Sequence, residues 1–286
     1  MRRRHKPHRI WLMLKLPPIS FANLGERTRY WVTVGISCLP PNRYRSIFVL
    51  GYPRTGTNWL CTVLNHYTGI QINEFWLRKL PIIGPVILHL HRFAIVRNRT
   101  IYMIRDPRDI AISRYHKALA DPGVLSRNLA EKYCDAPMTH ENLRVNLPGY
   151  IRYLFEEITP STPALAAHFR KARSLGLYTV RYEDMLERGE ETLTGIVEFL
   201  DGREADRKRV RDTLKATTFE KHTGRKPGVE DLDTVVARKG IAGDWKNQFS
   251  AEAARVFDQY AGDLLIEFGY ERDHQWVEQL GDSVPR

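Results

Sequence analysis

The strongest constraint on the fold is a short apolar run that leads directly into a glycine-containing turn and then into a helix. The run is IFVL at residues 47–50, the turn is GYPRTGTN at 51–58, and the following segment has apolar residues at helical spacing. A strand, a glycine loop and a helix N-terminus in this order bind phosphate groups, because backbone N–H groups point at the anion. The stretch therefore predicts an α/β fold with an anion site in this loop.

The loop keeps the glycine spacing of the GxxxxGK[ST] motif but lacks its lysine. Thr57 stands where that motif places the lysine that reaches the β- and γ-phosphates of ATP. A kinase or ATPase of this type would also need a carboxylate for Mg²⁺ at the end of a second strand, where this chain has Arg105. The loop therefore favours a different anion, and a P-loop kinase or ATPase is the weaker alternative.

The rest of the chain alternates between apolar strands and amphipathic helices. The predicted strands cover residues 85–93, 98–104 and 176–182, and the predicted helices cover 107–120, 146–158, 163–172, 190–200, 204–215 and 251–268. Such alternation predicts a mostly parallel central sheet with helices on both faces. In sheets of this kind ligands bind beyond the carboxyl ends of the strands. We expect one domain at 46–272, preceded by an extension at 1–45 and followed by a tail at 273–286.

The charge of the chain indicates either an anionic partner or a solvated basic surface that aids solubility. The formal net charge is +11, which suits nucleic acid, a membrane surface or a polyanionic small molecule. The sequence shows no RNP, helix-turn-helix or zinc-finger signature, so no nucleic-acid partner is predicted. Cys38, Cys61 and Cys134 have neither metal-ligand spacing nor a disulfide pattern, and no apolar run reaches ~18 residues. We expect a metal-free, cytoplasmic protein.

The N-terminus is basic and then briefly apolar, in the sequence MRRRHKPHRIWLMLKLPPIS at residues 1–20. The apolar part is too short for a membrane span and leads into no cleavage site of small residues. Two interpretations stay open. The first is a disordered basic tail, and the second is a peripheral membrane contact in which Trp11, Leu12 and Leu14 enter the interface beside anionic lipid.

Two further stretches carry cations next to helix or loop signals. In RDPRDIAISRYH, Asp106 and Pro107 begin a helix, which leaves Arg105 at the tip of the preceding strand, and Ser113 lies about two turns into that helix. A guanidinium and a hydroxyl so placed can bind one anion; the alternative is that Arg105 only pairs with nearby acidic residues. In ARKGIAGDWKNQF, at residues 237–249, two glycines stand among Arg238, Lys239 and Lys246. This composition indicates either a cover that closes over phosphate or an ordinary solvated loop.

The chain resembles the sulfotransferases that use 3′-phosphoadenosine 5′-phosphosulfate, of the cytosolic type. The resemblance rests on YPRTGTNW, RDPRDIAISRYH, VRYEDM, TTFEK and RKGIAGDWKNQF, which occur in the family's order between residues 46 and 270. It implies a P-loop-like phosphosulfate-binding loop, this donor as co-substrate and no metal. A donor without a γ-phosphate has no need of the loop lysine. A noncatalytic module that binds nucleotides or polyanions is a further alternative, which turnover would distinguish.

The resemblance also assigns roles to single residues by their motif positions. The 5′-phosphate and the scissile bridge are assigned to Arg54, Thr55, Gly56, Thr57 and Asn58, with Arg54 in the place of the family's usual lysine. The 3′-phosphate is assigned to Arg105, Ser113, Arg238, Lys239 and Gly240. The adenine is assigned to Trp59, Tyr182, Thr217 and Phe219. The dimer pattern of the family is altered at residues 246–255, so no oligomeric state is predicted.

The general base is expected in PVILHLHRF, where side chains alternate and His89 and His91 therefore point to the same face. Aligning Pro85 with the proline of the family motif puts His89 at a lysine position and His91 at the histidine position. We therefore expect His91 to take the acceptor's proton, with Arg54 and His89 offsetting charge on the departing phosphate oxygen.

The acceptor side is expected in residues 68–97 and 121–165. The first range mixes apolar and basic side chains: Ile70, Phe75, Trp76, Leu77, Arg78, Lys79, Ile82, Ile83, Arg92 and Arg97. These are either ordinary packing or the lining for an amphiphilic hydroxyl or amine acceptor, such as a lipid, a phenol or a glycolipid. A carbohydrate acceptor stays open, as does the choice between O- and N-sulfation.

Overall fold

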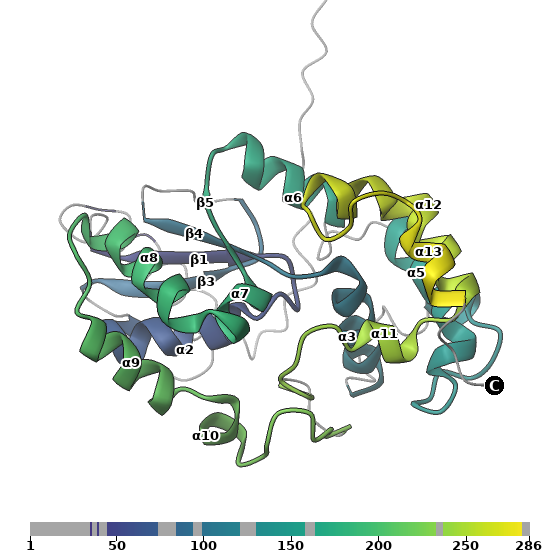
Figure 1. Ribbon diagram of the computed structural model, residues 1–286, viewed down its shortest axis with the longest axis horizontal. Helices are drawn as coiled ribbons and strands as arrows, with labels where there is room; N and C mark the ends of the chain where they lie inside the picture. The colour runs from purple at the N-terminus through teal and green to yellow at the C-terminus, as the bar shows by residue number, and fades with distance from the viewer. Residues whose placement is uncertain are drawn as a thin grey trace, which may run out of the picture.

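The computed structural model describes residues 35, 39, 45–73, 84–93, 99–120, 130–157, 164–232 and 237–281. These residues contain a five-stranded sheet in the order β2-β3-β1-β4-β5 (Figure 1). All pairings are parallel, so the carboxyl ends of the strands meet at one edge. The predicted parallel sheet is confirmed. The strands are β1 (Ile47–Gly51), β2 (Gln71–Ile72), β3 (Val86–Leu90), β4 (Thr100–Ile104) and β5 (Tyr178–Arg181).

Each helix predicted from periodicity is present, with its ends within three residues of the expected ones. Several elements were missed because they are too short to show a period. Those are β2, α7, α10, α11, α13 and a single 3₁₀ turn at Glu131–Tyr133. The helices are α2 (Thr57–Thr68), α3 (Pro107–Ala120), α5 (Leu143–Glu156), α6 (Leu165–Ser174), α7 (Tyr182–Glu187), α8 (Gly189–Asp201), α9 (Arg207–Ala216), α10 (Phe219–Thr223), α11 (Trp245–Gln248), α12 (Ala251–Glu267) and α13 (Trp276–Gly281).

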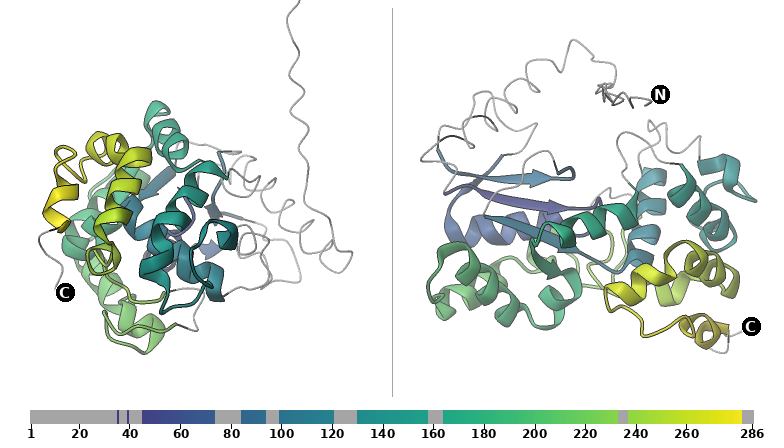
Figure 2. Two further views of the ribbon diagram at one scale, coloured as in Figure 1. Left: turned by 90° about the vertical axis from the view of Figure 1, so that its right-hand side faces the viewer. Right: turned by 90° about the horizontal axis from the view of Figure 1, so that it is seen from above.

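Every residue of the central strand β1 is buried, because helices cover both faces of the sheet. Phe48 and Leu50 pack into a core formed with α3, α5, α6, α12 and α13. Ile47 and Val49 point to the opposite face and pack with α2, α7, α8 and α9. Figures 1 and 2 show the two sets apart, with α8 and α9 far from α12 and α13.

The predicted extension and tail are only partly within the described residues. The segment at residues 1–20 lies outside them, so its membrane contact stays a prediction. Residue 276, within the predicted tail, is the buried Trp276, which packs into the core, while the boundary at 272 stays a prediction. In the part of the chain that the structure describes, no helix has the length and apolar character needed to cross a bilayer.

A buried arginine fixes the start of α3. The Arg108 side chain is 1% exposed and binds the Asp106 carboxylate through Nε (3.0 Å) and Nη2 (2.8 Å). Its Nη1 contacts Glu271 at 2.5 Å, and the guanidinium lies 3.6 Å from the ring centroid of Trp245 and 4.7 Å from that of Trp276. One cation thus ties the end of β4 to α11 and to the segment after α12. This connection positions the residues that follow in the site.

Replacing Arg108 by alanine is expected to lower the free energy of unfolding by about 3–5 kcal/mol, because it leaves the buried Asp106 carboxylate without its cation. Chemical denaturation followed by circular dichroism measures this loss. Arg170→Ala is the control, since Arg170 is 52% exposed in its pair with Glu267 and its removal should cost below about 1 kcal/mol. Equal losses in the two variants would contradict the role given to Arg108.

Candidate active site

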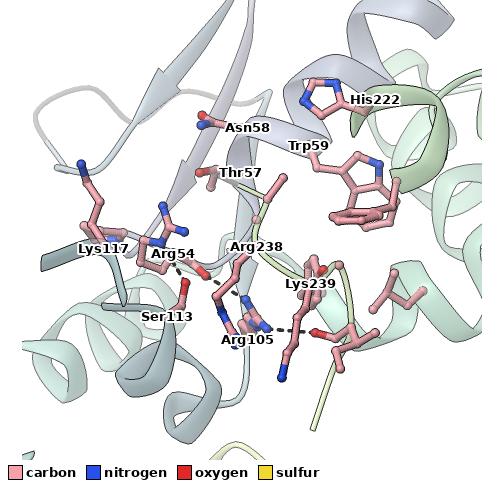
Figure 3. Close-up of a pocket in the computed structure, with 18 of the residues that line it drawn as sticks. Arg54, Thr57, Asn58, Trp59, Arg105, Ser113, Lys117, His222, Arg238 and Lys239 are labelled. Carbon is pink, nitrogen blue, oxygen red and sulfur yellow. Dashed lines mark hydrogen bonds between the residues drawn. The ribbon is translucent and has the colours of Figure 1, made fainter. Parts of the chain in front are cut away.

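A cavity of about 290 Å³ lies beyond the carboxyl ends of the strands and gathers residues from distant parts of the chain. Figure 3 shows Arg54, Ser113 and Arg105 on one side of it, and Trp59 with His222 on the other. Of the residues predicted for the site, these line the cavity: Arg54, Gly56, Thr57, Asn58, Trp59, His89, His91, Arg105, Ser113, Tyr182, Phe219, Arg238, Lys239 and Gly240. Thr55 and Thr217 are not among the lining residues.

The loop between β1 and α2 depends on two glycines. A Cβ at Gly51 would lie 2.5 Å from Thr55 Oγ1 and 2.9 Å from the carbonyl oxygen of Met103. Gly56 has φ 95°, in the left-handed region that favours glycine, and a Cβ there would lie 2.6 Å from the Tyr182 ring. The Thr55 hydroxyl donates to the Tyr52 carbonyl at 2.8 Å. Thr55 therefore stabilises the loop through a buried hydrogen bond, and its hydroxyl does not face the cavity.

The two histidines lie side by side, with ring centroids 4.5 Å apart. Nε2 of His89 is 2.6 Å from the Thr57 hydroxyl oxygen. Nδ1 of His91 is 2.8 Å from the carbonyl oxygen of Gly51. Because a carbonyl only accepts, Nδ1 of His91 carries the proton, and Nε2 of the neutral ring is the acceptor nitrogen.

Both histidines are neutral at physiological pH. Burial, with a smaller contribution from His91, lowers the pKa of His89 to about 3. Burial also lowers the pKa of His91; the Gly51 hydrogen bond opposes this shift, and the nearby cations Arg54 and Arg114 add to it. A neutral imidazole is the form that can accept a proton.

Positive charge is concentrated on the other side of the cavity. The Nε of Arg54 donates to Ser113 Oγ at 2.9 Å, and Arg105 Nη2 donates to the Ile241 carbonyl at 3.0 Å. Burial and the neighbouring cations Arg105, Arg114 and Arg238 lower the pKa of Arg54 to about 10. Such a drop means that the guanidinium groups repel each other in a poorly solvated place. A bound anion would relieve that repulsion.

A loop at residues 237–244, here called the lid, covers this cluster of cations. The Asp109 carboxylate accepts the backbone N–H groups of Gly243 (2.8 Å) and Trp245 (3.0 Å). Arg225 clamps the segment by donating to the carbonyl groups of Val229 (3.1 Å), Ala237 (2.9 Å) and Arg238 (2.8 Å). The sequence predicts neither the Asp109 contacts nor the Arg225 contacts, since no local pattern marks them.

The two lid cations are held by carboxylates. The Arg238 guanidinium contacts both Glu230 and Asp244, the second at 2.5 Å. Lys239 Nζ lies 2.9 Å from Asp244 and 3.5 Å from Glu230. The sequence predicts neither carboxylate. It assigns Arg238 and Lys239 to a phosphate and therefore gives them no partner within the protein.

Aromatic side chains form the remaining wall. The Trp59 indole donates to the Thr217 carbonyl at 2.9 Å and meets the Tyr182 ring edge-on, with centroids 5.7 Å apart. Thr217 thus orients Trp59 rather than lining the cavity. A Cβ at Gly240 would lie 2.2 Å from the Phe219 ring, so only glycine lets the lid approach it. Other lining residues that were not predicted are Pro53, Lys117, Leu186, His222, Ala237, Ile241 and Asp244.

Two of the ten residues named for the acceptor side, Ile70 and Arg92, lie within the described residues. Ile70 packs beside the core under α2, and Arg92 is exposed. The others lie outside the described residues: Phe75, Trp76, Leu77, Arg78, Lys79, Ile82, Ile83 and Arg97. Their assignment to the acceptor stays a prediction.

Comparisons with known proteins agree with the motifs. The sequence model described as Sulfotransferase domain matches residues 79–269. Human Sulfotransferase 2A1 is 25% identical over 269 residues, which are 80% of this chain and 87% of that protein. Human Sulfotransferase 2B1 is 24% identical over 257 residues, but the match spans only 64% of its length and 74% of this chain.

Solved structures show the same fold. A mouse sulfotransferase, SULT7A1, complexed with PAP, has a TM-score of 0.55 at 17% identity, covering 83% of this chain and 89% of that one. Retinol dehydratase in complex with androsterone and the inactive cofactor PAP has a TM-score of 0.56 at 16% identity, covering 84% and 85%. Because the domain model matches more than half of the chain, the protein belongs to the family of 3′-phosphoadenosine 5′-phosphosulfate-dependent sulfotransferases that its five motifs predict.

Proposed function

We propose that the protein transfers the sulfuryl group of 3′-phosphoadenosine 5′-phosphosulfate in line to a hydroxyl or amine of an amphiphilic acceptor, with His91 as the general base. The observation that carries the proposal is a single cavity. It is lined both by a cluster of arginines and by the neutral His91, whose Nε2 is unprotonated. Cations at one side suit a nucleotide with several phosphates, and a base at the other suits an acceptor proton.

We propose one orientation of the donor in the cavity. Backbone N–H groups at the start of α2, with Thr57 and Asn58, face the 5′-phosphosulfate, as expected for an anion at a helix N-terminus. Arg105, Ser113 and lid residues 238–240 hold the 3′-phosphate. The adenine lies against the aromatic wall of Trp59, Tyr182 and Phe219.

In the transfer, the bond from sulfur to the bridging phosphate oxygen breaks and a bond from sulfur to the acceptor oxygen or nitrogen forms. Nε2 of His91 takes the acceptor's proton, so a sulfated product and 3′-phosphoadenosine 5′-phosphate (PAP) are formed. Arg54 lies where it offsets charge on the departing phosphate oxygen. His89 is neutral, so it contributes a hydrogen bond through Thr57 rather than a charge.

The acceptor class is proposed from two supports. Retinol dehydratase, which shares the fold, has been solved with androsterone and with retinol, and both are apolar molecules with a hydroxyl group. The predicted acceptor segments of this chain mix apolar and basic residues. We therefore propose a hydroxylated lipid, phenol or glycolipid. Mass spectrometry of a lipid extract incubated with the enzyme and the donor tests this, and a lack of any sulfated product would favour a noncatalytic binding module.

PAP is expected to bind at least about tenfold more tightly than AMP, because two or three charge-assisted contacts to the 3′-phosphate are each worth about 1.5–3 kcal/mol. Isothermal calorimetry measures both affinities. A chelator should leave PAP binding unchanged. Equal affinities for the two nucleotides would rule out the proposed donor site.

His91→Ala is expected to reduce kcat by about 10²–10⁴-fold while PAP affinity stays near wild type, because general-base loss affects the chemical step. His89→Ala is the matched control, since it removes the neighbouring ring, and it should cost less. Single-turnover kinetics measure both variants, with an acceptor whose sulfated product the mass spectrometry detects. If His91→Ala keeps most of its turnover, another residue is the base.

The pH profile of kcat/KM should show an acidic limb below about pH 6.5, the ordinary histidine value. The pKa of His91 is lowered by burial and by Arg54 and Arg114, so the ring stays an unprotonated base to lower pH. Activity should fall only as the pH drops through this lowered pKa. The measurement is a set of initial rates from pH 4.5 to 8, and a limb well above the ordinary value would contradict the assignment.

A further inference from the structure

Two carboxylates neutralise the positive charges of the two lid cations, Arg238 and Lys239. Arg238 and Lys239 are each in contact with both Glu230 and Asp244. Two cations with two carboxylates are balanced. A phosphate can therefore gain the full attraction of this pair only if one carboxylate leaves.

Asp244 is the carboxylate that stays. Its side chain is 3% exposed, and it belongs to the lid itself, next to Trp245, whose N–H is bound by Asp109. Moving Asp244 would open the lid and leave buried polar groups without partners, which is costly.

Glu230 is the carboxylate that can move. Its side chain is 31% exposed, ten times the fraction of Asp244. Its neighbours hold the backbone beside the lid, because Gly228 N–H donates to the Lys239 carbonyl (2.8 Å) and Asp231 N–H donates to the Arg238 carbonyl (3.3 Å). The side chain can therefore rotate away while the backbone remains in place.

A hydrogen-bond donor is available for the displaced carboxylate. His116, on the same face of α3 as Ser113, is 8% exposed, and its Nε2 has no hydrogen-bond partner among the residues that the structure describes. This nitrogen lies 4.0 Å from Glu230 Oε1, about 1 Å beyond hydrogen-bond distance. Its Nδ1 is 3.0 Å from His140 Nδ1, and when His140 donates there, Nε2 of His116 carries the proton and can donate to a carboxylate.

We infer that Glu230 is an internal competitor of the 3′-phosphate: it holds the lid cations in the free protein, moves to His116 when the nucleotide binds, and returns to help expel PAP. The inference rests on the proposed donor site. A 3′-phosphate carries two negative charges and can displace one carboxylate, whereas the 3′-hydroxyl of AMP cannot. Product release limits the rate of many enzymes, and where it does, a competitor of this kind speeds turnover.

Glu230→Gln tests the competition, because it removes the charge and keeps the shape. We expect PAP to bind about three- to tenfold more tightly and to dissociate more slowly, with AMP affinity changed less than about twofold. Glu220→Gln is the control, since it removes one charge from an exposed residue of α10 beside the cavity-lining Phe219, and it should change PAP affinity less than about twofold. Calorimetry gives the affinities, and stopped-flow displacement gives the PAP dissociation rate.

Unchanged or weaker PAP binding in Glu230→Gln would overturn the inference, as would an equal gain in Glu220→Gln, which would indicate a general charge effect. If the wild-type protein binds PAP no better than AMP, the donor site itself fails instead. A double-mutant cycle tests the role of His116. His116→Asn removes Nε2 and should weaken PAP binding about two- to fivefold in the wild type but not in Glu230→Gln. The same effect in both backgrounds would rule out His116 as the receiving group.

Discussion

The site depends on the buried carboxylate of Asp109. It stands in the first turn of α3, is 1% exposed, and holds the N–H groups of Gly243 and Trp245 from a loop more than a hundred residues away. Its other neighbour is Arg105, at 3.5 Å. Burial raises the pKa of Asp109, and Arg105 opposes that shift. One charge thus places the lid over the end of β4 and orients the arginine beneath it.

Oxygen atoms of the protein itself contact the cations of the cavity. Ser113 accepts from Arg54, the Ile241 carbonyl accepts from Arg105, and two carboxylates hold the lid cations. Burial lowers the pKa of Arg54 most, and the repulsion between neighbouring cations, which adds to this shift, would be larger without such acceptors. The free energy of nucleotide binding is therefore the difference between the contacts that the cations make with the nucleotide and those that they make within the protein. The weakest contact within the protein is the first to break.

Much of the fold could be predicted because its signals are local. The strand, glycine loop and helix at residues 47–68 and the long helices follow from periodicity and from Gly51 and Gly56. The motifs also predicted most of the cavity lining. Arg225, Glu230 and Asp244 could not be predicted, because each acts on backbone or charges that only the folded chain brings near. The inward turn of the Thr55 hydroxyl likewise depends on loop dihedral angles that a residue type does not fix.

The choice between His89 and His91 as the proposed base needs information beyond the strand pattern. Alternation along a strand puts His89 and His91 on one face and cannot separate them. Their hydrogen bonds differ, because Nε2 of His89 is engaged by Thr57, whereas His91 is engaged through Nδ1 by the Gly51 carbonyl. The second arrangement fixes the tautomer of His91 and leaves its Nε2 unprotonated, which is the state that the proposed base requires. Gly51 is the glycine that allows the loop to lie close to β4, and its carbonyl also fixes the proton on Nδ1 of His91. The loop geometry and the tautomer of the proposed base are therefore linked through one peptide group.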